Sequence, residues 1–262
     1  QADSPLAFHL EKGEASGQEK NWKAAYDQLA ALRAKGIRTD FAYCEPDELD
    51  KIFCLADEPP KMTPVAGEVY EDRVRGAWFA RCAAVILGKP LEMGFDRLKI
   101  KEYLESVEAY PLNDWVPARS EKLDITLRKD CVPSTKGNVQ YVQSDDDIHY
   151  TICSLLLAEK AGENFTRWDA AENLLDNISY NWVWTADKQL YYQMVNCNSK
   201  AEFESWDPAE WILHNPWHES MCSQLKADLW GYITPGDVRR GGAMIHRLGG
   251  LSASKNGLYG GL

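Results

Sequence analysis

The chain has 262 residues, of which 45% are hydrophobic, and this is enough for one large domain or two small ones. Its formal net charge of -11 argues against binding to anionic surfaces, so we expect no nucleic acid and no membrane among its partners. No stretch reaches the roughly 18–20 apolar residues of a membrane-spanning helix.

Residues 1–66 are expected to form an N-terminal helical extension. A loose start over 1–16 precedes an amphipathic pattern over 17–35, and a second, short helix is predicted over 45–53. A cluster of helix-breaking residues over 57–64 places the boundary of the extension near residue 66. We expect a soluble protein, but the chain starts at Gln1, and the sequence leaves open whether the protein is cytoplasmic or exported.

Residues 67–262 are expected to form the main domain, with an almost entirely helical spacing of apolar residues. A mostly apolar stretch over 70–92 predicts a buried helix that Gly88 and Pro90 end. Further helices are predicted over 95–106, 148–161, 166–178, 181–195, 217–229 and 238–251, with Thr166 as an N-cap. The segments 107–140 and 196–216 are expected to be irregular. The predicted fold class is therefore all-α, a helical bundle with long loops over one face.

The cysteines give little indication of a metal site or of a disulfide framework. Their number, seven, is odd, and none forms a Cys-x-x-Cys pair, so we expect neither a full set of disulfides nor a zinc ribbon. Cys82 and Cys153 lie in apolar helical patterns and are predicted to be buried thiols.

Four polar residues, Ser144, Asp145, Asp146 and Asp147, directly precede the helical pattern over 148–161. Hard oxygen ligands of this kind suit Mg²⁺, Mn²⁺ or Ca²⁺. Adjacent carboxylates also repel one another unless a cation or solvent relieves them. The alternative is a helix cap, in which one residue caps and its neighbours favour the positive end of the helix. A cap accounts for one or two of these residues rather than four, and both interpretations stay open.

Four segments in order resemble the ADP-ribosylglycohydrolase family, in particular its bacterial branch. The run Leu87-Gly-Lys-Pro-Leu-Glu92 resembles the end of the family's first helix, and the run 144–151 resembles its Ser/Thr-Asp-Asp metal motif. Residues 224–236 are similar to its Ile-Arg-Ala-Asp-x-x-Gly-Tyr segment, and residues 251–260 to its Ser-His-x-x-Asn-Gly-x-Tyr-Gly segment. The resemblance covers about residues 70–262.

The resemblance implies an all-helical bundle around two Mg²⁺ ions, with Mn²⁺ possible in their place. It implies hydrolysis of the bond between ADP-ribose and an acceptor, so the expected partner is a substrate that contains ADP-ribose. Carried over residue by residue, the metal ligands would be Ser144, Asp145 and Asp146, and the catalytic residues Glu92 and Asp146. The residues near the substrate would be Asp147, Asp228, Asn256 and Gly257.

Adenine could stack on an aromatic side chain, for which the candidates are Tyr141, Trp182, Trp184 and Trp230. General burial tendencies favour each of these residues as part of the core instead.

This sequence departs from the family pattern at three points. The family has a second metal motif of the type Asp-x-Asp-Ser/Thr, and none follows residue 147, so we expect another chain or a segment beyond Leu262 to complete the site. Lys226 stands where the third motif has Arg, and Ala253 where the fourth has His; Lys does not replace Arg at a bidentate phosphate contact. The alternative function is a non-catalytic ADP-ribose- or nucleotide-binding module, or a scaffold that retains the fold.

Overall fold

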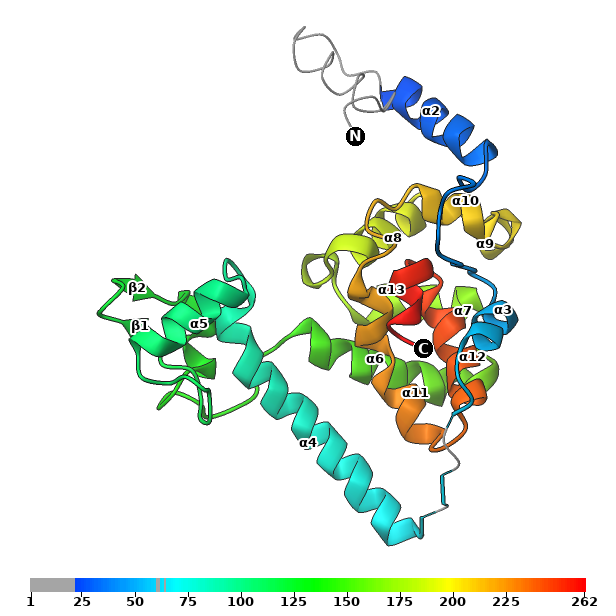
Figure 1. Ribbon diagram of the computed structural model, residues 1–262. Helices are drawn as coiled ribbons and strands as arrows, with labels where there is room; N and C mark the ends of the chain where they lie inside the picture. Colours follow the sequence, from blue (N-terminus) through cyan, green and yellow to red (C-terminus); the bar gives the residue numbers. More distant parts are fainter. Residues whose placement is uncertain (1–21, 60–61, 64) are drawn as a thin grey trace, which may run out of the picture. The chain divides into compact units, whose positions relative to one another are not determined.

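The computed structural model describes residues 22–59, 62–63 and 65–262 (Figure 1). The chain divides into two compact units, Gln1–Cys44 and Glu45–Leu262. In the first unit, α2 (Trp22–Ala34) covers most of the helix predicted over 17–35. Gly36 follows it with a φ of 74°, a conformation that a residue without a side chain adopts at little cost. The loose start predicted over 1–16 lies outside the described residues.

The second unit is helical apart from one short strand pair, which confirms the all-α class. Its first half contains α3 (Leu49–Leu55), α4 (Gly67–Glu92), α5 (Arg97–Ser106), β1 (Arg119–Ser120), β2 (Ile125–Thr126), η1 (Lys129–Ser134), α6 (Asp146–Ala161), η2 (Gly162–Asn164) and α7 (Arg167–Asn177). Its second half contains η3 (Tyr180–Trp182), α8 (Thr185–Val195), α9 (Lys200–Ser205), α10 (Pro208–Leu213), η4 (Met221–Lys226), α11 (Asp228–Ile233), α12 (Val238–Gly249) and α13 (Lys255–Tyr259). The two strands are antiparallel, with Arg119 opposite Thr126.

Two hydrophobic clusters form the interior of the second unit. The larger one contains buried side chains of α6, α7, α8 and α12, including Leu157, Leu190 and Met244. The smaller one joins Leu91, near the end of α4, to Tyr103 of α5 and to Val116. In Figure 1, α4 runs from near α11 to α5 and the strand pair, and its residue Leu91 belongs to the smaller cluster.

The predicted N-cap at Thr166 is confirmed. Its hydroxyl accepts a hydrogen bond from the Asp169 N–H at 3.1 Å, and the Asp169 carboxylate accepts one from the Thr166 N–H at 2.7 Å. This reciprocal pair is a capping box, which satisfies backbone donors that the first turn of α7 leaves free. The acceptor role lowers the pKa of Asp169 below its usual value.

The prediction for the helix over 70–92 is wrong in two respects. Only four residues of α4 are buried, and the small residues along it, such as Gly76, Ala80 and Ala84, are exposed. The helix also continues through Gly88 and Pro90 to Glu92. Pro90 is itself buried, and we attribute its place in the last turn to packing that offsets the backbone hydrogen bond proline cannot donate.

Three segments differ from the predicted pattern. The loop over 107–140 contains the strand pair and η1, and the irregular segment over 196–216 contains α9 and α10. These two short helices begin at the caps Ser199 and Asp207, with Pro208 in the first turn, and they bury Phe203 and Trp211. The helix predicted over 217–229 is divided into η4 and α11. In the segment before η4, the His218 carbonyl accepts a hydrogen bond from the Ser254 N–H at 2.8 Å, which ties this segment to the start of α13.

All seven cysteines are free. Cys153 is buried as predicted, whereas Cys82 is only half-buried. Among the described residues, no helix combines the length and the apolar character needed to cross a membrane.

Candidate metal centre

The acidic run Asp145–Asp147 forms the start of α6. Asp145 is the N-cap, and its carboxylate accepts a hydrogen bond from the Asp147 N–H at 3.2 Å. Asp146 and Asp147 occupy the first turn, where the helix dipole favours negative charge. This arrangement agrees with the cap interpretation, in which Asp145 caps the helix and Asp146 and Asp147 lie at its positive end.

The three carboxylates lie close together. One oxygen from each of Asp145, Asp146 and Asp147 can be chosen so that all three lie within 4.8 Å of one another. Burial, followed by the charges of Asp145 and Asp147, raises the pKa of Asp146 to about 6. Burial also raises the pKa of Asp147, although the charge of Arg81 opposes that change. The cluster therefore concentrates negative charge in a partly desolvated place.

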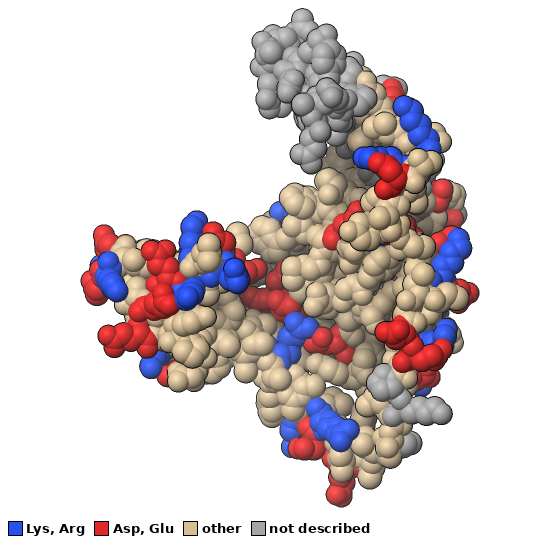
Figure 2. Space-filling view, viewed as in Figure 1, with Lys and Arg blue, Asp and Glu red and all other residues tan. Residues whose placement is uncertain are grey.

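Two cations of α4 lie against this cluster, and sequence analysis missed both. Lys89 Nζ lies 2.7 Å from Asp145 Oδ2 and also donates to the Ser144 carbonyl at 2.8 Å. Arg81 donates to Asp147 Oδ1 at 2.8 Å and, through Nε, to Asp228 Oδ2 at 2.6 Å. Hydrogen bonding to Asp228 raises the pKa of Arg81 further. Figure 2 shows acidic side chains in the hollow between the α5 end of the second unit and its larger group of helices.

The donor set fits a hard divalent cation. Three carboxylate oxygens within 4.8 Å can surround an ion whose ligand distances are roughly 2.0–2.6 Å. Among the described residues, Asp146 forms no salt bridge, so its carboxylate is open to a cation. Asp145 and Asp147 already pair with Lys89 and Arg81, and an ion would compete with these two side chains.

The remaining predicted metal ligand, Ser144, faces a histidine. Its hydroxyl lies 2.9 Å from His149 Nε2. The His149 ring in turn meets Trp182 edge to face, with ring centroids 5.7 Å apart. Burial lowers the pKa of His149, which favours the neutral ring.

Of the predicted residues outside the run, Glu92 and Asp228 belong to this neighbourhood. Glu92 is exposed at the end of α4, yet its charge contributes to the raised pKa of Asp146. Asp228 is linked to Asp147 through Arg81 and also accepts a hydrogen bond from the Tyr232 hydroxyl at 3.3 Å.

Asn256 and Gly257 make their contacts elsewhere. The Asn256 amide donates to Glu219 Oε2 at 3.0 Å, and the Gly257 carbonyl accepts a hydrogen bond from Ser223. A Cβ atom at residue 257 would collide with the backbone carbonyls of His218 and Ser220. These contacts assign both residues to the packing of α13 against η4 and the turn before it.

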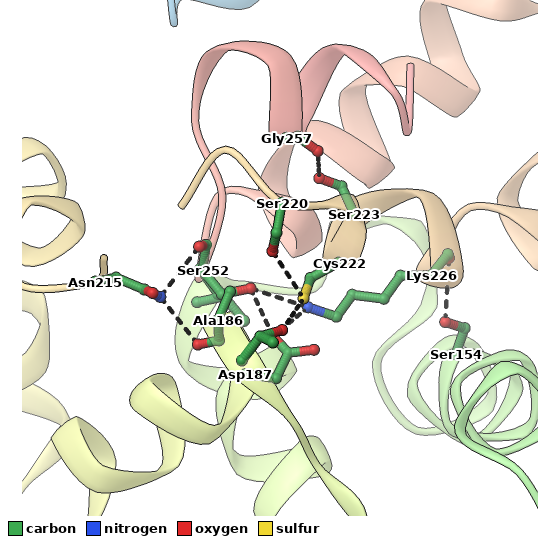
Figure 3. Close-up of polar contacts among 12 residues, drawn as sticks. Ser154, Ala186, Asp187, Asn215, Ser220, Cys222, Ser223, Lys226, Ser252 and Gly257 are labelled. Atoms are coloured by element: carbon green, nitrogen blue, oxygen red, sulfur yellow. Dashed lines mark hydrogen bonds and ion pairs between the residues drawn. The ribbon is translucent and has the colours of Figure 1, made fainter. Parts of the chain in front are cut away.

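Lys226, which stands where the third motif has Arg, is buried, and its side chain points toward Asp187 (Figure 3). Its Nζ lies 2.6 Å from Asp187 Oδ1 and 3.1 Å from Ser252 Oγ, and the Ser252 hydroxyl donates to the same Asp187 oxygen at 2.6 Å. The exposed fractions are 2% for Lys226 and 0% for both Asp187 and Ser252. Lys226 therefore holds η4 to α8 and has no surface left for a phosphate.

The four adenine-stacking candidates divide into two groups. Trp230 is 1% exposed and belongs to the core. Tyr141, Trp182 and Trp184 each expose about half of their surface, between 48% and 58%. The prediction that these side chains belong to the core is therefore wrong for Tyr141, Trp182 and Trp184.

Comparison of this chain with family models, with curated proteins and with solved structures finds no match.

Proposed function

We propose that this chain is a Mg²⁺-dependent hydrolase of the ADP-ribosylglycohydrolase type, which cleaves an N- or O-glycosidic bond of ADP-ribose or of a related ribosyl glycoside. The observation that carries the proposal is the approach of three carboxylate oxygens to within 4.8 Å at the start of α6. Clustered, partly buried like charges cost stability, and such clusters are frequent at functional sites. The four ordered sequence segments support the same class.

In this proposal Asp145 and Asp146 would hold Mg²⁺, as the resemblance implies. Asp147, which the resemblance places near the substrate, would be the third ligand instead of Ser144, because its carboxylate lies within 4.8 Å of the other two and the Ser144 hydroxyl contacts His149. When bound, the ion would lower the pKa of a water molecule and orient the ribose hydroxyls. Lys89 and Arg81 pair with Asp145 and Asp147 from the α4 side, and the ion would compete with these two side chains for the carboxylates.

Two carboxylates are available to move the proton. Asp146, the carboxylate of the cluster that pairs with no lysine or arginine among the described residues, would accept a proton from the attacking water. Glu92 is exposed at the edge of the cluster and is the second candidate for the acid–base role. Asp228, which Arg81 holds beside Asp147, is the candidate for a contact with the substrate.

The second candidate function is a non-catalytic module that binds ADP-ribose or a nucleotide. The observation that favours it is the pairing of Asp145 with Lys89 and of Asp147 with Arg81. These cations offset two of the three negative charges without any metal, so the cluster is compatible with a metal-free fold.

The test is release of ADP-ribose from an ADP-ribosylated protein, measured with Mg²⁺ and with EDTA. We expect turnover that EDTA abolishes and that Asp146→Asn lowers at least 100-fold. A matched control is Asp50→Asn, which removes an exposed carboxylate from the first turn of α3. Binding of ADP-ribose without turnover in Mg²⁺ would contradict the hydrolase and support the module.

A further inference from the structure

One face of α8 lines a cleft that is separate from the carboxylate cluster. The helix contributes side chains at positions i, i+3, i+4 and i+7, which share one face of a helix. The cleft has a volume of about 280 Å³ and is lined by Thr185, Lys188, Gln189 and Tyr192 of α8 together with Tyr180 and Trp217. The other face of α8 carries the buried side chains Leu190 and Met194, so the helix is anchored in the core.

A buried asparagine, Asn215, links the first turn of α8 to the turn that carries Trp217; Figure 3 shows Asn215 beside Ala186 of α8. The Asn215 amide donates to the Ala186 carbonyl at 2.9 Å, and its Oδ1 accepts from the Trp217 N–H at 3.1 Å. Asn215 is 1% exposed. The turn that carries Trp217 is thus tied to the first turn of α8, and the cleft is formed before any ligand arrives.

The cleft exposes an unusual amount of aromatic surface. The exposed fractions of its aromatic lining residues are 47% for Tyr180, 62% for Tyr192 and 53% for Trp217, and Trp184, the residue before α8, is 56% exposed. Large apolar side chains gathered at a surface mark binding sites, and aromatic rings stack well on other flat rings. Neighbouring Thr185 has a φ of 44°, a conformation that β-branched residues rarely adopt and that concentrates at functional sites.

The charged group in the cleft is a lysine. Lys188 Nζ lies 4.6 Å from the centroid of the Tyr180 ring and 5.1 Å from that of Trp184. Within the described part of the chain, Lys188 forms no salt bridge with a carboxylate. In a protein of net charge -11, a cation held between aromatic rings and left without an acidic partner is complementary to an anion.

We propose that this cleft binds a small ligand that combines a planar aromatic ring with an anionic group. The ring stacks on the exposed faces of Tyr192 or Trp217, and the anion pairs with Lys188. Ligand sites for drug-sized molecules have volumes of roughly 300–1,000 Å³, so a cleft of 280 Å³ limits the ligand to about the size of a mononucleotide. The site is independent of the proposed hydrolase, because none of its lining residues belongs to the carboxylate cluster.

The experiment is calorimetric titration of the whole chain with three probes in EDTA, which keeps the carboxylate cluster free of metal. AMP carries both ring and anion, adenosine only the ring with its sugar, and ribose 5-phosphate only the anion. We expect AMP to bind at least 10-fold more tightly than either partial probe. Lys188→Gln and Trp217→Ala should each weaken AMP binding at least 10-fold, which is about 1.4 kcal/mol.

Two control variants test the location of the site. Lys101→Gln removes a lysine that also lies over an exposed ring, that of Tyr110 at 5.5 Å, but that pairs with Glu105 and lines no part of this cleft. Asp146→Asn alters the carboxylate cluster. We expect AMP binding to be unchanged in both.

Three results would overturn the inference. One is the absence of AMP binding, and another is equal AMP binding by the wild type, Lys188→Gln and Trp217→Ala. The third is binding of adenosine or of ribose 5-phosphate as tight as that of AMP, because ring and anion would then not act together.

Discussion

Replacing Asp146 with Asn should stabilise the metal-free protein at neutral pH. Asp146 is half-buried between two other carboxylates, and its pKa is raised from 3.8 to about 6. A folded-state pKa above the unfolded value means that the neutral form is the one that the fold favours. The contribution of this group to stability is therefore complete below about pH 3.8 and is lost as the pH rises through about 6.

The magnitude follows from the pKa values. A rise from 3.8 to about 6 corresponds to about 3 kcal/mol at roughly 1.36 kcal/mol per pH unit. Because Asp146 keeps part of its surface in water, solvent screening reduces this figure, and we expect about 1–2 kcal/mol. Asp146→Asn removes the charge and keeps the shape, so the variant should gain this amount at pH 7.5 and little at pH 4.

The assay is urea unfolding in EDTA at pH 4, 5, 6 and 7.5. Asp169→Asn is a control for which we expect the opposite change in stability. The capping box lowers the pKa of Asp169, so loss of its carboxylate should destabilise the protein at neutral pH. Adding Mg²⁺ at pH 7.5 should stabilise the wild type and leave Asp146→Asn unchanged. A loss of stability in Asp146→Asn at pH 7.5, or a gain that is the same at every pH, would mean that the charge of Asp146 does not destabilise the metal-free fold.

Three further changes have defined outcomes. Lys226→Met leaves the Asp187 carboxylate buried without its cation and should lower the free energy of unfolding by about 3–5 kcal/mol in urea. Adding Asp187→Leu should recover most of that loss. An equal loss in the double variant would argue against the ion pair. Thr166→Ala removes the cap of α7 and should cost about 1 kcal/mol by the same measurement, and no loss would contradict the capping box. Lys89→Gln removes a cation 2.7 Å from Asp145 and should tighten Mg²⁺ binding several-fold in calorimetry; weaker binding would mean that the lysine supports the metal site instead of competing with it.

Local sequence signals predicted much of the helical framework. The Thr166 cap and the start of the helix over 238–251 are determined by contacts within one turn, and both agree with the structure. The acidic run at the start of α6 was also visible, because its residues are adjacent in the sequence.

Contacts between distant residues account for what sequence analysis missed. Arg81 lies 66 positions from Asp147 and Lys89 lies 56 positions from Asp145, so no local pattern indicates that α4 carries the cations of the cluster. Lysine is usually found at the surface. Only the buried partner Asp187, 39 positions away, explains why Lys226 lies in the interior. In the same way, α10 depends on the burial of Trp211 in the core.

In the function proposed for this chain, the carboxylates of Asp145, Asp146 and Asp147 hold a divalent cation that the ADP-ribosyl substrate requires. The most direct measurement is calorimetric titration of ADP-ribose into this chain, first in Mg²⁺ and then in EDTA, with the wild type and with Asp145→Asn and Asp146→Asn combined. We predict binding in Mg²⁺ that is lost in EDTA and lost in the double variant. Binding of equal strength in Mg²⁺ and EDTA, or in the wild type and the double variant, would contradict the claim.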